Sequence, residues 1–67
     1  MKPDWQLRVI QESAELDLKL KKLEEFITTN SGFKDLNLFE QTRLRDQRHH
    51  MAEYSKILHE RMVHFNV

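Results

Sequence analysis

The chain has 67 residues, so it forms one domain at most, and a lone domain of this size buries only about 60% of its unfolded surface. It contains no cysteine, which excludes both a disulfide framework and a thiolate metal site. Eleven basic and eleven acidic side chains balance, which argues against a general nucleic-acid coat, whereas 33% charged residues with one glycine and one proline are typical of an all-helical protein.

The sequence predicts neither a signal peptide nor a membrane span. Its first residues contain no apolar run of sufficient length, and no stretch approaches the roughly 18–20 apolar residues that a span requires. We therefore expect a cytoplasmic protein without membrane contact. Because the core is small, we also expect oligomerisation to supply part of the stability.

The first predicted helix covers about residues 4–29. Pro3 suits the first turn of a helix, and Asp4 is favoured at its positive N-terminal end. Apolar residues then recur at i, i+3, i+4 and i+7, which predicts the face that packs in the core. These core positions are Val9, Leu16, Leu20, Leu23 and Ile27, with Trp5 and Phe26 at the edge of the face.

A second apolar stripe lies on the other side of the same helix. It consists of Leu7, Ile10, Ala14 and Leu18, spaced 3, 4 and 4 residues apart. A two-helix hairpin covers only one side of each helix, so this stripe is predicted to meet another copy of the chain or a partner. The alternative is that these residues belong to a wide core.

The only clear break is the run Thr28-Thr29-Asn30-Ser31-Gly32, and a loop is predicted over about residues 30–37. We expect Gly32, or else Asn30, to take the left-handed conformation that ends a helix. Phe33 and Leu36 are then expected to fold back and cover the end of the hairpin.

The second long helix is predicted over about residues 38–65. Asn37 and Glu40 have the spacing of a capping box, with asparagine in place of the usual serine or threonine. Its apolar face comprises Leu44, Met51, Tyr54, Leu58, Met62 and Phe65. A break within the polar stretch 45–50 is the alternative and would give three helices.

Two helices of matched length joined by a short loop predict an antiparallel hairpin. The expected fold is therefore all-α, a single helical domain over residues 1–67 that assembles as a homo-oligomeric bundle. Gln47 falls inside the apolar face of the second helix. Because a buried amide needs partners, we expect it to hydrogen-bond across a subunit interface and fix its register.

Neither a metal site nor catalysis is predicted. No two histidines have the i, i+4 spacing of a helical zinc site; they are His49, His50, His59 and His64. The chain has no glycine-rich phosphate loop, and Ser13 and Ser55 lie mid-helix, where a nucleophile is hard to activate without a neighbouring base. We expect a non-enzymatic protein without a cofactor.

A polar ribbon beside the core face of the second helix is the best candidate for function. Its members are Arg43, His50, Tyr54, Ile57 and Arg61, spaced 7, 4, 3 and 4 residues apart. Guanidinium groups bind phosphate through paired hydrogen bonds, and a tyrosine ring offers a stacking surface for a base. In a symmetric oligomer each ribbon is duplicated, so two half-sites would close around one anionic ligand. The alternative is that the two arginines pair with acidic residues across the hairpin, at Asp4, Glu12 or Glu15.

Nearly the whole chain, residues 5–65, resembles the small phage-encoded proteins related to gene product forty-eight of a crAss-like bacteriophage. The matching elements are Trp5-Gln6-x-Arg8-Val9, Glu12, Leu16-x-x-Lys19, Leu23-x-x-Phe26, Phe33, Glu40-Gln41, Leu44, Gln47, Met51-x-x-Tyr54, Ile57-Leu58, Arg61-Met62 and Phe65. The resemblance implies a phage accessory protein that acts in the infected bacterial host, without implying a mechanism. Phages use many small helical oligomers against host immunity.

Ribbon and resemblance together suggest a counter-defence protein that sequesters a nucleotide-derived immune signal, of the cyclic nucleotide or ADP-ribose type, between subunits. The expected ligand contacts are Arg8, Tyr54, Arg61, Gln6, Lys19, Arg43 and His50. The alternative is an inhibitor that binds a host defence protein through the stripe from Leu7 to Leu18. A purely structural or regulatory phage component is a third possibility, and binding of nucleic acid is the least expected.

Overall fold

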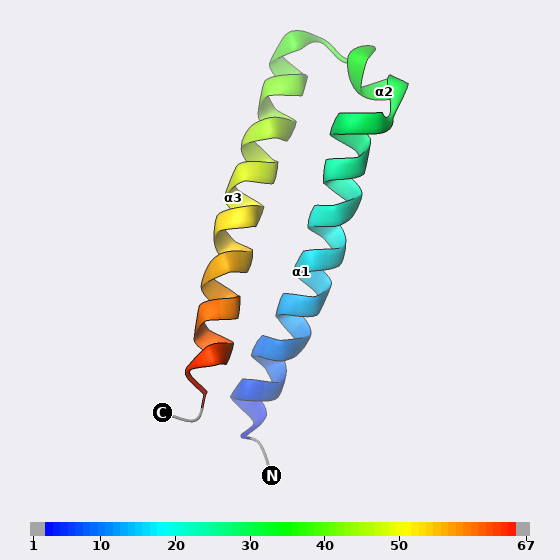
Figure 1. The fold of residues 1–67 in the computed structure, drawn as a ribbon. Helices are drawn as coiled ribbons and strands as arrows, with labels where there is room; N and C mark the ends of the chain where they lie inside the picture. The colour runs from blue at the N-terminus through cyan, green and yellow to red at the C-terminus, as the bar shows by residue number, and fades with distance from the viewer. Residues whose placement is uncertain (1–2, 66–67) are drawn as a thin grey trace.

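The computed structural model describes residues 3–65, which form an elongated helical hairpin (Figure 1). Helix α1 spans Asp4–Thr29, the single-turn helix α2 spans Ser31–Lys34, and helix α3 spans Leu38–Val63. Helices α1 and α3 run antiparallel, so both chain ends lie at one end of the molecule and α2 at the other. The principal extents are 49 × 15 × 15 Å. The predicted all-α hairpin is confirmed; its assembly into an oligomer stays a prediction.

Helix α1 begins where the sequence predicts, with Pro3 as its N-cap; proline has no backbone N–H that the start of a helix would leave unpaired. The Pro3 carbonyl oxygen accepts hydrogen bonds from the backbone N–H groups of Gln6, at 3.0 Å, and Leu7, at 3.3 Å. Asp4 lies in the first turn, where a carboxylate favours the positive end of the helix dipole.

The end of α1 differs from the expectation. No residue among 3–65 has a positive φ, and Asn30 is extended, with φ −90° and ψ 123°. The prediction of a left-handed residue was therefore wrong. Because α2 starts at once, Asn30 acts as its N-cap, and its Oδ1 accepts a hydrogen bond from the N–H of Gly32 at 2.8 Å. A Cβ on Gly32 would lie 3.0 Å from that same oxygen, so close approach explains this glycine.

Phe33, in helix α2, packs over the end of the hairpin, as predicted. Phe33 is buried, and its ring meets that of Phe26 edge-on at 6.1 Å. The guanidinium of Arg45 from α3 lies 5.1 Å from the centre of the Phe33 ring. Leu36 is half-buried beside it. The tip is thus closed by one aromatic ring held between both long helices.

The predicted N-cap of α3 at Asn37 is confirmed, whereas Glu40 does not complete the capping box. Asn37 Oδ1 accepts a hydrogen bond from the N–H of Glu40 at 2.8 Å. The Glu40 carboxylate forms an ion pair with Arg43 at 3.0 Å on its own helix. Helix α3 continues through residues 45–50, so the alternative of a break there is excluded.

The core lies along the seam between α1 and α3. Val9, Leu16 and Leu58 form its buried cluster, and Leu58 has no exposed surface at all. Partly buried side chains complete the seam: Met51, Met62 and Phe65 against this cluster, and Leu20, Leu23, Ile27 and Leu44 further toward the tip. Both predicted stripes therefore face each other, although much of their length stays half-exposed.

One predicted core position is wrong. Tyr54 is 43% exposed, and its neighbour Ser55 is the buried residue. Consecutive residues on a helix point about 100° apart, so the two side chains leave the seam on opposite edges. Tyr54 donates a hydrogen bond to Glu12, whereas Ser55 donates one to Asp17 at 2.5 Å. Helix α3 is therefore hydrogen-bonded to α1 on both sides of the seam.

Asp17 is the centre of a polar clasp, which we define as Ser13, Asp17, Ser55 and His59. The second carboxylate oxygen of Asp17 lies 2.8 Å from His59 Nε2, and the Ser13 hydroxyl lies 3.4 Å from the same nitrogen. The hydrogen bond from Ser55, and then the contact with His59, hold the pKa of the Asp17 carboxyl below its ordinary value of 3.8. This clasp satisfies both of the serines that the seam buries.

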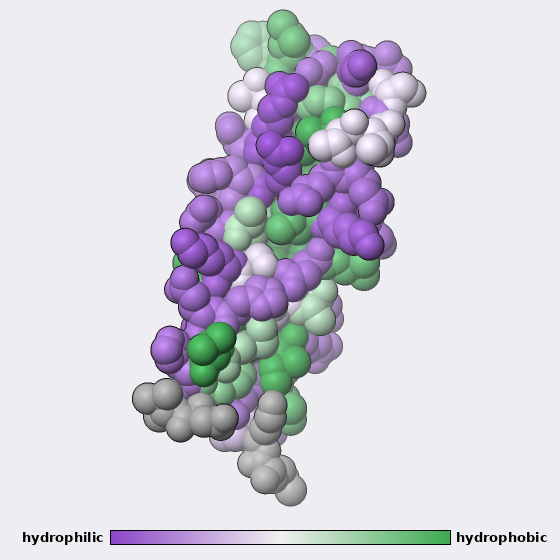
Figure 2. Space-filling model, viewed as in Figure 1, coloured by the Kyte–Doolittle hydropathy of each residue, from purple (hydrophilic) through white to green (hydrophobic). Residues whose placement is uncertain are grey.

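The second stripe of α1 points away from α3, as the hairpin geometry requires. Leu7 is 51% exposed and Leu18 is 54% exposed, Ala14 is exposed, and Ile10 is half-buried. Figure 2 shows hydrophilic residues along both helices, with apolar residues visible between them and near the end that carries the termini. No helix among the described residues is long and apolar enough to cross a membrane.

Replacing Leu58 by alanine is expected to lower the free energy of unfolding by about 2–5 kcal/mol, because it opens a cavity at the only fully buried apolar position of the seam. Urea denaturation followed by circular dichroism measures the effect. Leu38→Ala is the matched control, since Leu38 is 76% exposed at the tip and its truncation opens no cavity. Equal losses for the two variants would contradict the assigned core.

Asp17→Asn is expected to flatten the dependence of stability on acid pH. Because the folded-state pKa of Asp17 lies below 3.8, its carboxylate contributes stability that is complete above that value and is lost as pH falls through the folded pKa. Melting temperatures measured from pH 6 to pH 2.5 should therefore fall less steeply for the variant than for the wild type. Asp46→Asn, at an exposed position of α3, is the control and should keep the wild-type slope.

Candidate functional site

The polar ribbon lies on the edge of the seam that Tyr54 marks. Tyr54 contacts Glu12 across the helices, and the helical spacing of 3 and 4 residues continues the ribbon to Ile57 and Arg61. The polar clasp occupies the opposite edge. We call the side with Tyr54 the arginine edge. A ligand that binds to the ribbon would therefore contact only one face of the hairpin.

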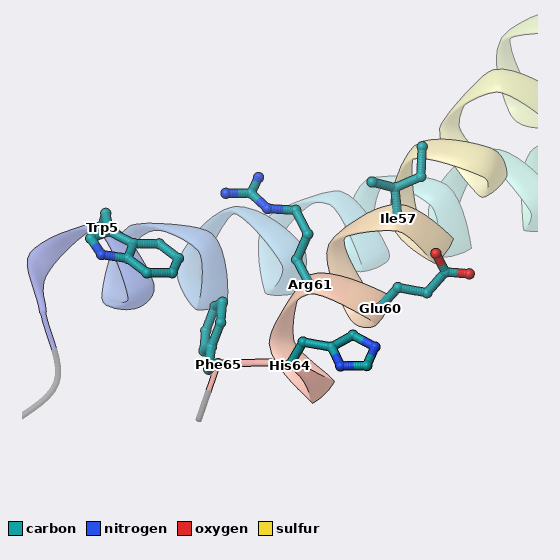
Figure 3. Close-up of a pocket in the computed structure, with 6 residues that line it drawn as sticks. All are labelled: Trp5, Ile57, Glu60, Arg61, His64 and Phe65. Atoms are coloured by element: carbon teal, nitrogen blue, oxygen red, sulfur yellow. The ribbon is translucent and has the colours of Figure 1, made fainter. Parts of the chain in front are cut away.

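A cavity of about 520 Å³ opens at the end of the arginine edge where the termini lie (Figure 3). Its lining residues are Trp5, Ile57, Glu60, Arg61, His64 and Phe65. The first turn of α1 supplies Trp5, and the last turns of α3 and the residues after it supply the rest. The cavity is a property of the two helix ends together, because neither helix alone brings these residues to one place.

An aromatic pair forms one wall of this cavity. The rings of Trp5 and Phe65 meet edge-to-face, 5.2 Å apart at 81°. The position of Phe65 is held by Gln6, whose buried side-chain amide donates a hydrogen bond to the Phe65 carbonyl at 3.0 Å. The Phe65 N–H in turn donates to the carbonyl of Met62 at 3.3 Å. The wall is therefore built before any ligand arrives.

Arg61 supplies the cation of the cavity. Its guanidinium extends toward α1 in Figure 3, whereas the Glu60 carboxylate points away from Trp5. Arg61 forms no ion pair with another described residue, so its five donors stay available. A guanidinium suits the two oxygens of a phosphate, and the exposed indole of Trp5 offers a face for a planar ring. The cavity thus combines the two chemistries that nucleotides need.

The remaining ribbon residues lie further along the hairpin. Arg43 is 18 residues from Arg61 and so about 27 Å away along the helix, where it pairs with Glu40. The pairing across the hairpin that was the alternative for Arg43 is therefore absent. His50 is exposed, with its ring edge-on to His49 at 5.4 Å. One cavity in this chain accommodates Arg61 but not Arg43.

The other predicted contacts, three on α1 and Gln47 on α3, have different surroundings. Arg8 and Lys19 are exposed, so both are open to a ligand or to another chain. The amide of Gln6 is engaged with the backbone beneath the cavity. Gln47, predicted at a subunit interface, is exposed, and its Nε2 lies 3.7 Å from Met51 Sδ. The roles of all four in binding or assembly stay predictions.

Most of the cavity lining differs from the ligand contacts that the sequence predicts. The sequence places Trp5 at the edge of the core, and Glu60, His64 and Phe65 are not among its predicted ligand contacts. A single tryptophan beside the start of a helix is a signal that was available. Whether this tryptophan lines a cavity depends on which residues of α3 lie opposite it. Those residues are known only when the register of the two helices is known.

The polar clasp has the residue types of a hydrolytic triad but not its geometry. In a triad the histidine uses one ring nitrogen for the serine and the other for the carboxylate. Here His59 Nε2 faces both the Ser13 hydroxyl and the Asp17 carboxylate. No proton is relayed through the imidazole in this arrangement, and the clasp holds the helices together.

Comparison with known proteins supports a binding role. Residues 3–64 match the Sequestin family, whose name denotes sequestration and so a binding rather than a catalytic role. Neither the curated proteins nor the solved structures contain a match to the chain. Because the match runs from just before the first residue of α1 to just after the last residue of α3, the chain belongs to the Sequestin family.

Proposed function

We propose that this protein is a phage counter-defence protein that sequesters a small nucleotide-derived immune signal in the cytoplasm of the infected host. The signal is of the cyclic nucleotide or ADP-ribose type. The family match supports sequestration, and the resemblance to crAss-like phage proteins supports the phage origin. The observation that carries the proposal is the cavity in which Arg61 lies beside Trp5 and Phe65.

Each part of the cavity has a counterpart in such a ligand. The indole of Trp5 stacks on the base, and such stacking contributes about 1–3 kcal/mol per base. Arg61 binds a phosphate through two parallel hydrogen bonds. The carboxylate of Glu60 and the imidazole of His64 are suited to ribose hydroxyls at the rim. Because the aromatic wall is held by Gln6, little ordering is needed when the ligand binds.

A second copy of the chain completes the site in this proposal. The cavity is open, and the arginine edge continues from it past Tyr54 to His50 and Arg43. A neighbouring subunit that covers this edge encloses the ligand and adds further cations from exposed positions such as Arg8 and Lys19. A protein that withdraws a signal from solution must enclose it, because enclosure slows release of the ligand.

Arg61→Gln is expected to weaken nucleotide binding by about 10- to 100-fold, because charged hydrogen bonds contribute about 1.5–3 kcal/mol. The measurement is isothermal titration calorimetry with a panel of cyclic nucleotides and ADP-ribose derivatives. Trp5 is the only tryptophan, so its fluorescence reports occupation of the cavity independently. Lys56→Gln also removes one positive charge from α3 but lies outside the cavity lining, and it should bind as the wild type does.

Sequestration also requires that the bound ligand is released chemically unchanged. After incubation and denaturation of the protein, mass spectrometry should recover the nucleotide intact. A product would show an enzyme instead. No binding to any member of the panel at tens of micromolar, by a correctly assembled oligomer, would overturn the proposed function.

A further inference from the structure

We propose that a second copy of this chain packs antiparallel against the outer face of α1, with the two helices crossing at Ala14. The surface involved is the exposed stripe Leu7, Ile10, Ala14 and Leu18, which we call the α1 ridge. The inference deepens the proposed function, because it rests on the expectation that the protein acts as an oligomer. It assigns the face, the direction and the register of one contact between copies, which is separate from the contact that covers the arginine edge.

The exposed area favours another copy of the chain as the occupant of the ridge. The protein exposes 5456 Å², whereas a compact monomer of 8.2 kDa exposes about 4,500 Å². The difference of about 950 Å² is comparable to the roughly 800 Å² that each partner buries in a standard interface. A hairpin has only one seam, so this excess is the outer surface of its helices. A second hairpin converts the pair into a four-helix bundle with an interior.

The middle of the ridge, from Ile10 to Leu18, is symmetric about Ala14. Ile10 precedes Ala14 by four residues and Leu18 follows it by four, so a two-fold axis at Ala14 brings Ile10 of one copy level with Leu18 of the other. By the same rule Leu7 meets the aliphatic stem of Lys21. The small side chain of Ala14 at the crossing point lets the two helices approach closely. The surface is therefore complementary to its own copy.

Charge selects the antiparallel direction. Asp4 and Lys22 are 18 residues apart, five full turns, so they lie on the same flank of α1 beside the ridge. Both are exposed, and neither forms an ion pair within residues 3–65. About Ala14 the antiparallel arrangement brings Asp4 of each copy within about 3 Å, along the axis, of the level of Lys22 of the other. In a parallel arrangement the two flanks that carry Asp4 and Lys22 lie on opposite sides of the interface, so this pair cannot form, and the helix dipoles add unfavourably.

The ridge shares no residue with the lining of the cavity. Association through the ridge therefore leaves the cavity accessible, and the two properties are separable by mutation. Ala14 is exposed in the single hairpin, so a polar side chain there is tolerated by the fold itself. In the proposed dimer the same side chain is buried against its own copy.

The first test is the mass of the ligand-free protein in solution by sedimentation equilibrium. The wild type should have twice the chain mass of 8.2 kDa, or a higher even multiple. Ala14→Glu should halve the mass while circular dichroism shows unchanged helix content, because it buries two like charges at the crossing point. Ala52→Glu, the same change at an exposed position of α3, should leave the mass unaltered. Dissociation by Phe39→Glu at the tip, without an effect of Ala14→Glu, would overturn the proposal.

The second test uses the absence of native cysteine to read the register. Mild oxidation should link Ala14→Cys into a covalent dimer, because the two Cα atoms lie within the roughly 7 Å that a disulfide spans. Lys21→Cys should remain unlinked, since its two copies are about 21 Å apart along the antiparallel helices. Efficient linkage of Lys21→Cys would indicate parallel packing and overturn the assignment.

These outcomes separate the inference from the proposed function. A wild type that is monomeric at 100 micromolar overturns the ridge as an interface of this chain, and leaves it free for the alternative, a host protein. A dimer with the predicted crosslinks that binds no nucleotide supports the interface and overturns sequestration.

Discussion

Contact of Leu58 with the cluster of Val9 and Leu16 is the interaction on which this hairpin depends. Two helices offer only one seam in which apolar surface can leave water, and most of this seam is half-exposed. Leu58 is the one apolar side chain from α3 that is fully enclosed, so it sets the rotation of α3 about its own axis. That rotation in turn decides which residues of α3 border the seam and which face outward.

The rotation separates two kinds of chemistry. On one edge, Ser55 and His59 are drawn into hydrogen bonds with Asp17, so their polar groups are occupied within the fold. On the other edge, Ile57 and Arg61 follow Tyr54 toward a cavity that two aromatic rings close from one side. One edge of the seam is thereby occupied by hydrogen bonds between the helices, whereas the other edge borders the cavity.

Much of the fold was predictable from local signals. The proline before α1 and the asparagine before α3 mark helix starts by chemistry that acts within one turn, and Phe33 was the obvious apolar residue in the connection. The assignments that failed needed distant or alternative partners. Apolar periodicity placed Tyr54 in the core, because a pattern of apolar residues cannot reveal that a buried serine occupies the adjacent position.

The candidate site was predictable only in part for the same reason. Arg61 was identified from its spacing along α3, which is local information. The contribution of Trp5 arises because the start of α1 lies opposite the end of α3, and the pairing of Gln6 with the Phe65 carbonyl joins residues 59 positions apart. Such contacts follow from the register of the hairpin rather than from the pattern of either helix.

The adjacency of Tyr54 and Ser55 has a consequence for how this sequence is able to change in evolution. Deleting or inserting one residue within α3 rotates everything beyond it by about 100°, which would carry residues of one edge toward the core and core residues toward the other edge. Substitutions are compatible with the hairpin at many positions, but changes of length within α3 are not. Length variation among related chains should therefore concentrate in the connection between α1 and α3, where one turn of helix rests on a single aromatic ring.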